Sequence, residues 1–380
     1  MKITKGGITQ AKGFKANGIW CGIKRSKKED LSLVVSDHVA NTACVFTKNS
    51  IVAAPLTVCK KHLKNNKAQA VIVNSGNANC FTGKSGYRHA EKMTELTAAS
   101  LNIKVSDVLV TSTGIIGKPL PIEHVESGMR NLVDGLSNKG GTQFAKGILT
   151  TDTTLKEKSV QIKIGSSVVN IGGCCKGSGM IAPNMATMLG FITTDAAISP
   201  KLLKIALKKA TEESFNCITV DGCMSTNDMV VLMANGQAGN TPIMDKGNEF
   251  DLFCKTLTFV CCDLAKKIVL DGEGATKFVK IQVKGAKTHK QAKDIGLMIA
   301  NSMLVKTAIY GSNPNWGRVA AAVGALGIKQ ISEDQLKIDF SSFKKKNVSI
   351  TTTLNIGNAS ATVFTSDLSH EYIRINTEYT

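Results

Sequence analysis

Buried-strand and helical patterns alternate along the chain. Apolar residues run together over residues 69–76 and 106–114, and each run ends in a polar turn with glycine, which predicts two buried strands. Between them, residues 88–101 space their apolar side chains as an amphipathic helix does. Strands separated by a helix in this way predict a sheet that is covered by helices.

The second half of the chain continues the same two patterns. Residues 159–173 alternate apolar and polar positions around a central glycine-serine turn, which predicts a hairpin. A serine and a proline stand where an N-cap and a first helical turn belong, so a helix is expected over residues 200–214. Residues 279–283 alternate as a half-exposed strand, and residues 347–364 predict a second hairpin. The fold class expected is α/β, a layered sandwich of mixed β-sheets covered by helices.

Residues 177–194 carry no charged side chain, although the chain has 47 Lys plus Arg and 29 Asp plus Glu. Such a segment is expected to be buried. Pro183 and Asn184 interrupt its apolar residues and argue against a membrane span. The pattern leaves two interpretations open: an ordinary buried strand or loop, or a nucleophile at Thr187 that is released by cleavage of the Ala186–Thr187 bond.

Composition describes an ordinary globular protein. The length of 380 residues predicts two lobes, and 43% hydrophobic with 20% charged residues is a typical globular balance. The start of the chain lacks the apolar core of a secretion signal. The eleven cysteines contain no Cys-x-x-Cys, so they are expected to be mostly buried thiols in a reducing cytoplasm. The six histidines form no ligand pair, and a metal site is not expected.

The formal charge of +18 raises the question of nucleic acid. Lysines come singly or in short clusters, aromatic residues are only 5%, and no binding motif is present, so nucleic acid is not expected as a partner. A basic field that attracts small anions is compatible with the charge. Nucleotide motifs are absent as well, because Gly117-Lys118 is followed by proline where a P-loop needs Ser or Thr.

A series of polar turns carries the most specific signal. The turns comprise residues 74–80, 111–117, 150–153, 176–189, 214–216, 220–222, 225–228, 271–277, 313–318 and 374–380. In this order, and over essentially the whole chain, they resemble the ornithine acetyltransferase family, the glutamate N-acetyltransferases of arginine biosynthesis. The segment over residues 176–189, Lys-Gly-Ser-Gly-Met-Ile-Ala-Pro-Asn-Met-Ala-Thr-Met-Leu, is the most specific of them.

The resemblance implies self-cleavage and a two-step reaction. Members of the family cut the Ala–Thr bond of this motif, here Ala186–Thr187, so residues 1–186 become an α chain and residues 187–380 a β chain. Two α and two β chains form a heterotetramer. Thr187 takes acetyl from N2-acetylornithine, releases ornithine and passes the acetyl group to glutamate. No cofactor is implied, although some members also accept acetyl-CoA as the acetyl donor.

Elementary chemistry agrees with this implication. A threonine hydroxyl needs a base, and cleavage creates an α-amine with a pKa of about 7.7–8.0 on the same residue, against about 10.4 for a lysine such as Lys176. Near neutral pH the α-amine is the better proton acceptor. Acyl transfer also needs donors for the oxyanion, and the family places them at Thr113 and Gly114 of this sequence.

The resemblance further assigns substrate contacts. They are Thr150, Thr151, Lys176, Thr187, Glu273, Asn376 and Thr380. The lysine suits a carboxylate of acetylornithine or glutamate, and Glu273 suits an amine. Which of the two adjacent threonines contacts substrate stays open.

The sequence departs from the family pattern at four places. Cys217 stands where arginine is expected, Cys223 and Asn313 stand where aspartate is expected, and the tail beyond Asn376 is one residue short, which puts Thr380 in doubt. Two other classes stay open: a related self-cleaving aminopeptidase, and an uncut basic binding protein without activity. The sequence does not decide whether acetyl-CoA is used.

Overall fold

The computed structural model describes residues 1–182 and 188–378. They form two compact units, as the chain length predicts. The first unit comprises residues 1–177, 188–214 and 225–264, and the second comprises residues 178–182, 215–224 and 265–378.

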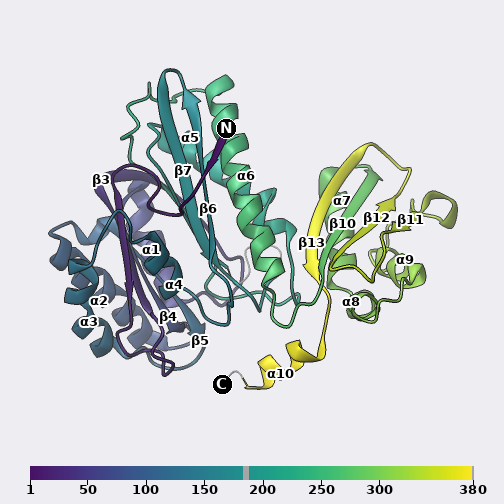
Figure 1. Ribbon diagram of the computed structural model, residues 1–380, viewed down its shortest axis with the longest axis horizontal. Coiled ribbons are helices and arrows are strands. Elements are labelled where there is room, and N and C mark those ends of the chain that lie inside the picture. Colours follow the sequence, from purple (N-terminus) through teal and green to yellow (C-terminus); the bar gives the residue numbers. More distant parts are fainter. Residues whose placement is uncertain (183–187, 379–380) are drawn as a thin grey trace. The chain divides into compact units, whose positions relative to one another are not determined.

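The first unit is built on one mixed sheet (Figure 1). Its strands are β1 (Lys2–Thr4), β2 (Phe14–Ile19), β3 (Leu31–Phe46), β4 (Lys67–Asn77), β5 (Val108–Ile115), β6 (Lys156–Ile164), β7 (Ser167–Lys176), β8 (Leu189–Thr194) and β9 (Met229–Ala234). Their order is β1-β6-β7-β8-β9-β3-β4-β5, and β2 pairs with β3. The pairs β4–β5 and β8–β9 are parallel, and the other pairs are antiparallel.

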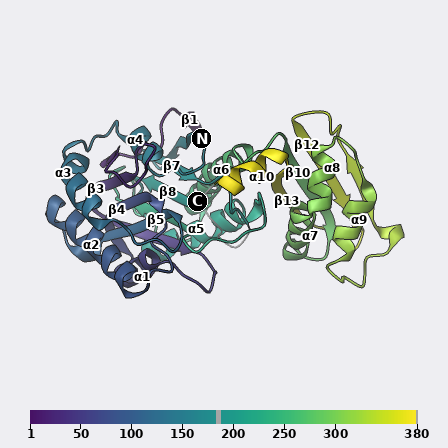
Figure 2. The ribbon, with the colours of Figure 1, turned by 90° about the horizontal axis from the view of Figure 1, so that it is seen from below.

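Helices cover this sheet. They are α1 (Ala54–His62), α2 (Gly83–Leu101), α3 (Ile122–Asp134), α4 (Gly141–Gly147), α5 (Pro200–Glu212) and α6 (Asn248–Leu270), and α6 continues into the second unit. Helices α1 and α2 pack against β5, α4 against β2 and β3, and α5 against β3. Figure 2 shows α2 and α3 side by side, and the two helices contact each other. Phe144 and Phe191 meet edge to face in the core, with ring centroids 5.1 Å apart.

The second unit has a four-stranded sheet of its own. Its strands are β10 (Phe278–Ala286), β11 (Lys337–Phe340), β12 (Asn347–Thr353) and β13 (Ala359–Ser366), in the order β11-β12-β10-β13. Its helices are α7 (His289–Asn301), α8 (Met303–Tyr310), α9 (Trp316–Gly324) and α10 (His370–Glu378). Helix α7 packs on β10 and β13, over the buried alternate side chains of β10. Short 3-10 helices lie at Leu63–Asn65, Val105–Asp107, Phe215–Cys217 and Glu333–Gln335.

Most sequence-based elements are confirmed. The strands expected at 69–76 and 106–114 are β4 and β5, the hairpin at 159–173 is β6–β7, and the helix at 200–214 is α5, which the side chain of Ser199 caps. The hairpin expected at 347–364 is wrong. Both strands exist as β12 and β13, but β10 lies between them, parallel to β12 and antiparallel to β13. Alternation identifies a strand, and it does not identify the strand's partner.

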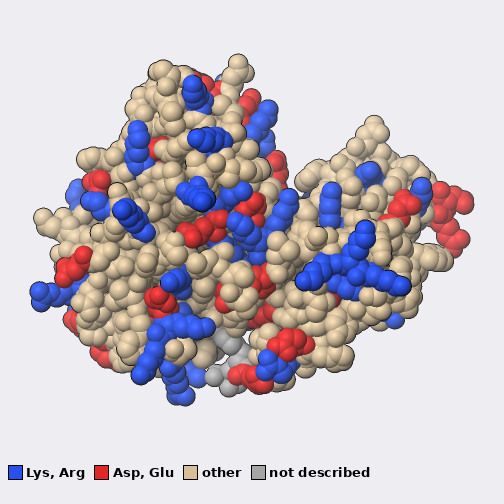
Figure 3. Space-filling view, viewed as in Figure 1, with Lys and Arg blue, Asp and Glu red and all other residues tan. Residues whose placement is uncertain are grey.

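The surface and the cysteines follow the composition. On the face in Figure 3, basic side chains occur in both units in small groups, with acidic side chains among them. No helix within residues 1–182 and 188–378 has the length and apolarity that a membrane crossing needs. The eleven cysteines are reduced thiols; most are buried, and only Cys223 among them is exposed.

Candidate active site

The turn at Thr113–Gly114 lies at the end of β5 in the first unit. Residues 108–113 of this strand are buried, and Gly114 pairs with Gly76 of β4. Gly114 has a φ of 134°, and a Cβ at this position would overlap the backbone of Gly76 and Asn77. The close approach of the two strands therefore requires glycine at 114.

Buried amides join this turn to two other polar turns of the sequence. The Ser112 hydroxyl donates to Asn74 Oδ1 at 2.5 Å, and Asn74 Nδ2 donates to the carbonyl of Asn77 at 2.9 Å. Asn227 Nδ2 donates to the carbonyls of Ala78 and Ser112 at 2.7 and 2.8 Å. The motifs at 74–80, 111–117 and 225–228 thus form one hydrogen-bonded cluster.

Asp152 organises the threonine turn at Thr150. Its Oδ2 accepts the backbone N–H of Thr150 at 3.1 Å, and its Oδ1 accepts the backbone N–H of Gly177 at 2.7 Å. The same Oδ1 lies 2.7 Å from Lys156 Nζ, and both side chains of this ion pair are fully buried. Because Gly177 follows Lys176, the carboxylate holds two predicted substrate-binding segments side by side.

The charges around Asp152 fix its ionisation. Burial alone raises the pKa of this carboxyl, but attraction to Lys156 and Lys176 and the Gly177 hydrogen bond outweigh it, so the pKa falls to about 2. The carboxylate is therefore ionised at neutral pH, beside two lysines. Lys176 itself is buried, at 3% exposure.

A second carboxylate, that of Asp228, lies beside Met188, the first residue of the described range 188–378. Asp228 Oδ1 accepts the backbone N–H of Met188 at 2.8 Å, and its buried Oδ2 has no hydrogen-bond partner within residues 1–182 and 188–378. Burial raises the pKa of Asp228 well above its ordinary value, although the Met188 N–H and the charge of Lys176 act in the opposite direction. Leu189, the next residue, is paired with Lys176 across β7 and β8.

Glu273 and Asn376 meet in the second unit. Asn376 Nδ2 of α10 donates to Glu273 Oε2 at 2.9 Å. The backbone N–H of Glu273 donates to the carbonyl of Ser178 at 3.0 Å, and Gly179 lies against its carboxylate so closely that a Cβ there would overlap it. The start of the 176–189 motif therefore packs on the predicted amine-binding residue.

Asp221 binds the backbone of the same segment two residues further along the chain. Its carboxylate accepts the backbone N–H groups of Met180 at 2.6 Å and Ile181 at 2.9 Å, and the Tyr372 hydroxyl donates to it at 3.3 Å. Burial raises the pKa of this carboxyl despite these hydrogen bonds. The departure at Cys223 lies here too, because its backbone N–H donates to Asp221 at 3.1 Å.

For five of the predicted site residues the structure leaves the prediction unchanged. Ala186, Thr187 and Thr380 lie outside the described residues. Thr150 and Thr151 are both half-buried, so the choice between them stays open. The other two substituted positions are a buried Cys217 and Asn313, whose backbone N–H donates to the carbonyl of Ala308 at 2.9 Å.

Four further residues of these clusters were not singled out by the sequence. They are Lys24, Asp152, Asp221 and Asp228. Each of the three aspartates stands inside a polar turn of the motif series, which is the signal that could have identified it. Lys24 lies in an ordinary lysine cluster, and no signal marks it.

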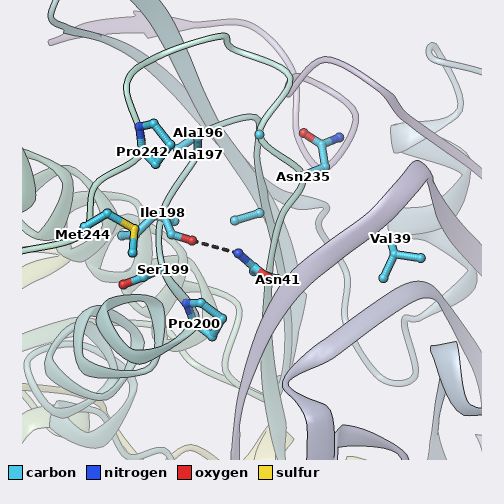
Figure 4. A pocket seen from close by; sticks show the side chains of 12 residues that line it. Val39, Asn41, Ala196, Ala197, Ile198, Ser199, Pro200, Asn235, Pro242 and Met244 are labelled. Atoms are coloured by element: carbon cyan, nitrogen blue, oxygen red, sulfur yellow. Dashed lines mark hydrogen bonds between the residues drawn. The ribbon is translucent and has the colours of Figure 1, made fainter.

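A hollow of the first unit lies apart from these residues (Figure 4). It has a volume of about 280 Å³. Asn41 Nδ2 donates to the Ile198 carbonyl at its wall, and Pro242 and Met244 line it as well. None of the predicted site residues lines this hollow. Within the residues that the structure describes, no group of three His, Cys, Asp or Glu side chains could hold a metal ion.

Comparison with known proteins identifies the family. The model of the ArgJ family matches residues 15–345. The arginine biosynthesis bifunctional protein ArgJ of Oceanobacillus iheyensis is 44% identical over 397 aligned positions, which cover 99% of this chain and 97% of that protein. The protein of the same name from Caldanaerobacter subterraneus subsp. tengcongensis is 43% identical over 402 positions, and both proteins are covered completely.

Two solved structures are also similar. The arginine biosynthesis bifunctional protein argJ of Bacillus halodurans has a TM-score of 0.46 at 42% identity, over 49% of this chain and 97% of that one. The ornithine acetyltransferase of Mycobacterium tuberculosis, complexed with ornithine, has a TM-score of 0.43 at 32% identity, over 48% and 97%. The extent of the family match and the identity of the full-length relatives confirm the resemblance: this chain belongs to the ArgJ family of arginine biosynthesis enzymes.

Proposed function

We propose that this chain cuts itself between Ala186 and Thr187 and then transfers acetyl from N2-acetyl-L-ornithine to L-glutamate. The Thr187 hydroxyl attacks the acetyl carbonyl, and L-ornithine leaves with the proton that the hydroxyl gave up. The amine of glutamate then attacks the acetyl-threonine ester. N-acetyl-L-glutamate leaves, and the hydroxyl of Thr187 is restored.

The clustering of the motif residues in the first unit carries this proposal. Asp152 binds the backbone at Thr150 and at Gly177, next to Lys176, and Lys176 pairs with Leu189 across the sheet. The proposed nucleophile precedes Leu189 by two residues in the sequence. Membership in the ArgJ family supports the same chemistry.

Each group has a defined task in this reaction. The α-amine of Thr187 accepts the hydroxyl proton and returns it to the leaving amine, because its pKa lies near neutral pH. Thr113 and Gly114 donate to the oxyanion that forms on the acetyl oxygen. Lys176 pairs with a substrate carboxylate, and Glu273 with Asn376 receives a substrate amine. Thr150, Thr151 and Thr380 are the remaining proposed substrate contacts.

The halves would stay together after the cut. The bond lies between β7 and β8, which are antiparallel neighbours in one sheet. Residues from both sides, such as Val71 and Phe191, share one hydrophobic core. We therefore infer an α chain of residues 1–186 and a β chain of residues 187–380 that remain associated, in a heterotetramer of two α and two β chains.

Intact mass spectrometry of the purified protein, with and without N2-acetylornithine, tests the proposal. The expected result is two fragments that join at 186/187, with one acetyl group gained on the fragment that begins with Thr187. The Thr187→Ala variant should stay uncut and gain no acetyl. A wild-type chain that is uncut and unacetylated would remove the mechanism.

Acetyl-CoA is a second candidate donor. The curated relatives are named bifunctional, which supports a second activity. Acetyl-CoA with glutamate, in place of acetylornithine, should yield N-acetylglutamate at a rate that vanishes in Thr187→Ala. If no product forms while acetylornithine is consumed, this chain has only the exchange activity.

A further inference from the structure

Lys24 makes contacts that no motif of the sequence anticipates. Its Nζ donates to the carbonyl of Leu149 at 2.7 Å and to the carbonyl of Glu29 at 2.6 Å. Leu149 immediately precedes Thr150, so the ammonium group holds the start of the threonine turn.

The aliphatic part of Lys24 lies against the glycine that supports the oxyanion turn. A Cβ on Gly76 would be 3.0 Å from Lys24 Cγ, and Gly76 has a φ of 97°. On its other side Gly76 lies so close to Gly114 that a side chain on Gly114 would overlap it. The methylene groups of Lys24 thus lie against Gly76, which packs on the oxyanion turn, and its ammonium group binds the start of the threonine turn.

Hydrogen bonds to Asp30 fix the backbone of the loop that carries Lys24. Asp30, which is fully buried, accepts the N–H of Lys24 at 2.8 Å and the N–H of Cys21 at 2.7 Å. The carbonyl of Asp30 accepts the N–H of Ser75 at 2.8 Å. Ser75 is the neighbour of Gly76, so the loop that carries Lys24 is fastened to the end of β4.

The electrostatic surroundings agree with a half-buried, constrained ammonium group. Burial lowers the pKa of Lys24 to about 8, and repulsion from Lys176 adds to the effect, while Asp30, Asp152 and Glu29 act in the opposite direction. Lys24 therefore lies in the same field as Lys176 and Asp152.

We propose that Lys24 is a positioning residue of the acetyl-transfer site, which sets the spacing between the oxyanion turn at Thr113–Gly114 and the substrate turn at Thr150–Thr151. The inference rests on the proposed function. Lys24 acts through the two turns and is not assigned a bond to substrate. Oxyanion stabilisation operates only in the transition state, so a misplaced Thr113–Gly114 turn lowers kcat more than it raises KM.

The test compares full-length wild-type protein with three variants. Lys24→Met keeps most of the stem and removes the donors, and Lys24→Arg keeps donors and charge. Lys28→Met is the matched control, because it removes an exposed charge from the same loop. Two quantities are measured for each: kcat and KM for acetyl transfer from N2-acetylornithine to glutamate, and amide hydrogen exchange in peptides that cover residues 111–117 and 147–153.

Lys24→Met is expected to lower kcat by about 10²-fold, with a smaller change in KM, and to speed exchange in both peptides. Lys24→Arg should recover part of the loss, and Lys28→Met should match wild type in both measurements. The inference is overturned if Lys24→Met keeps wild-type kcat and exchange. It is also overturned if exchange rises throughout the first unit to the same extent.

The two proposals fail differently in this experiment. If wild-type protein transfers no acetyl while exchange in the two peptides still responds to Lys24→Met and not to Lys28→Met, the proposed reaction fails and the positioning of the turns stands. If Lys24→Met does not fold, Lys24→Gln takes its place. If that variant also fails to fold, Lys24 is a residue of general stability and the inference is overturned.

Discussion

The buried ion pair of Asp152 and Lys156 offers the sharpest perturbation of the first unit. Asp152→Asn removes the negative charge and keeps the shape. The pKa of about 2, against 3.8 for a free side chain, corresponds to about 2 kcal/mol of net stabilisation by the charged form. Breaking other buried pairs costs about 3–5 kcal/mol. We therefore expect a loss of about 2–5 kcal/mol, or a Tm decrease of about 5–15 °C for the first unit.

Urea unfolding at neutral pH measures this loss. Asp134→Asn is the control, because Asp134 Oδ2 lies 3.6 Å from Arg130 Nε in a highly exposed pair, and its removal should cost less than about 1 kcal/mol. In the double variant Asp152→Asn/Lys156→Met, part of the loss should be recovered, since no buried ammonium remains opposite the amide. Equal losses in Asp152→Asn and Asp134→Asn would refute the reasoning.

The pH dependence gives an independent check with a definite sign. The pKa of Asp152 is lower in the folded protein than in the unfolded chain, so its contribution is complete above about pH 4 and disappears as the pH falls toward 2. The difference in stability between wild type and Asp152→Asn should therefore be constant from pH 7 to 5 and shrink at pH 3. A difference that grows on acidification contradicts the assignment.

Three further predictions concern other parts of the molecule. Gly114→Ala should lose most acetyl transfer and about 1–3 kcal/mol of stability. Gly247→Ala, where a Cβ meets nothing within 4 Å and φ is not positive, should keep transfer, and equal activities of the two variants contradict this. Asn376→Ala removes the hydrogen bond to Glu273 and should raise the KM for acetylornithine about 3- to 10-fold at similar kcat, by steady-state kinetics. Burial lowers the pKa of Lys306 to about 8, so the charged side chain destabilises the folded protein at pH 7 by about 3 kcal/mol. This destabilisation decreases as the pH rises from 8 to 10.5, and the stability of Lys306→Met relative to wild type should therefore fall over that range. A constant difference between the two proteins in urea unfolding refutes the prediction.

Local patterns were sufficient to predict most elements of the fold. Strands β4 and β5 and helix α5 are each specified by their own residues, through a buried apolar run or a capped helical start. The arrangement of β12 and β13 was not predictable in this way, because their common neighbour β10 lies about seventy residues earlier in the chain than β12. Pairing partners at such separations depend on packing that a local pattern does not contain.

The sequence likewise proposed some residues of the candidate site and missed others. Thr113, Gly114, Thr150 and Lys176 were proposed as site residues because their turns resemble those of a family. Lys24 was not, since a lysine in a basic cluster reads as a solvated side chain until the fold places Gly76 and Leu149 around it. Residues that act by holding others in place leave little trace in sequence.

The segment without charges shows why both kinds of information are needed. Its lack of charge correctly predicted burial for β8 and for Ile181, but Met180 in the same segment is exposed. Burial leaves backbone N–H groups to satisfy, and the segment has no charged acceptors of its own. Two aspartates from elsewhere supply them: Asp221 accepts the N–H groups of Met180 and Ile181, and Asp228 accepts that of Met188. Carboxylates from elsewhere in the chain thus bind the backbone of this uncharged segment at residues 180 and 181, before the proposed cleavage site, and at residue 188, after it.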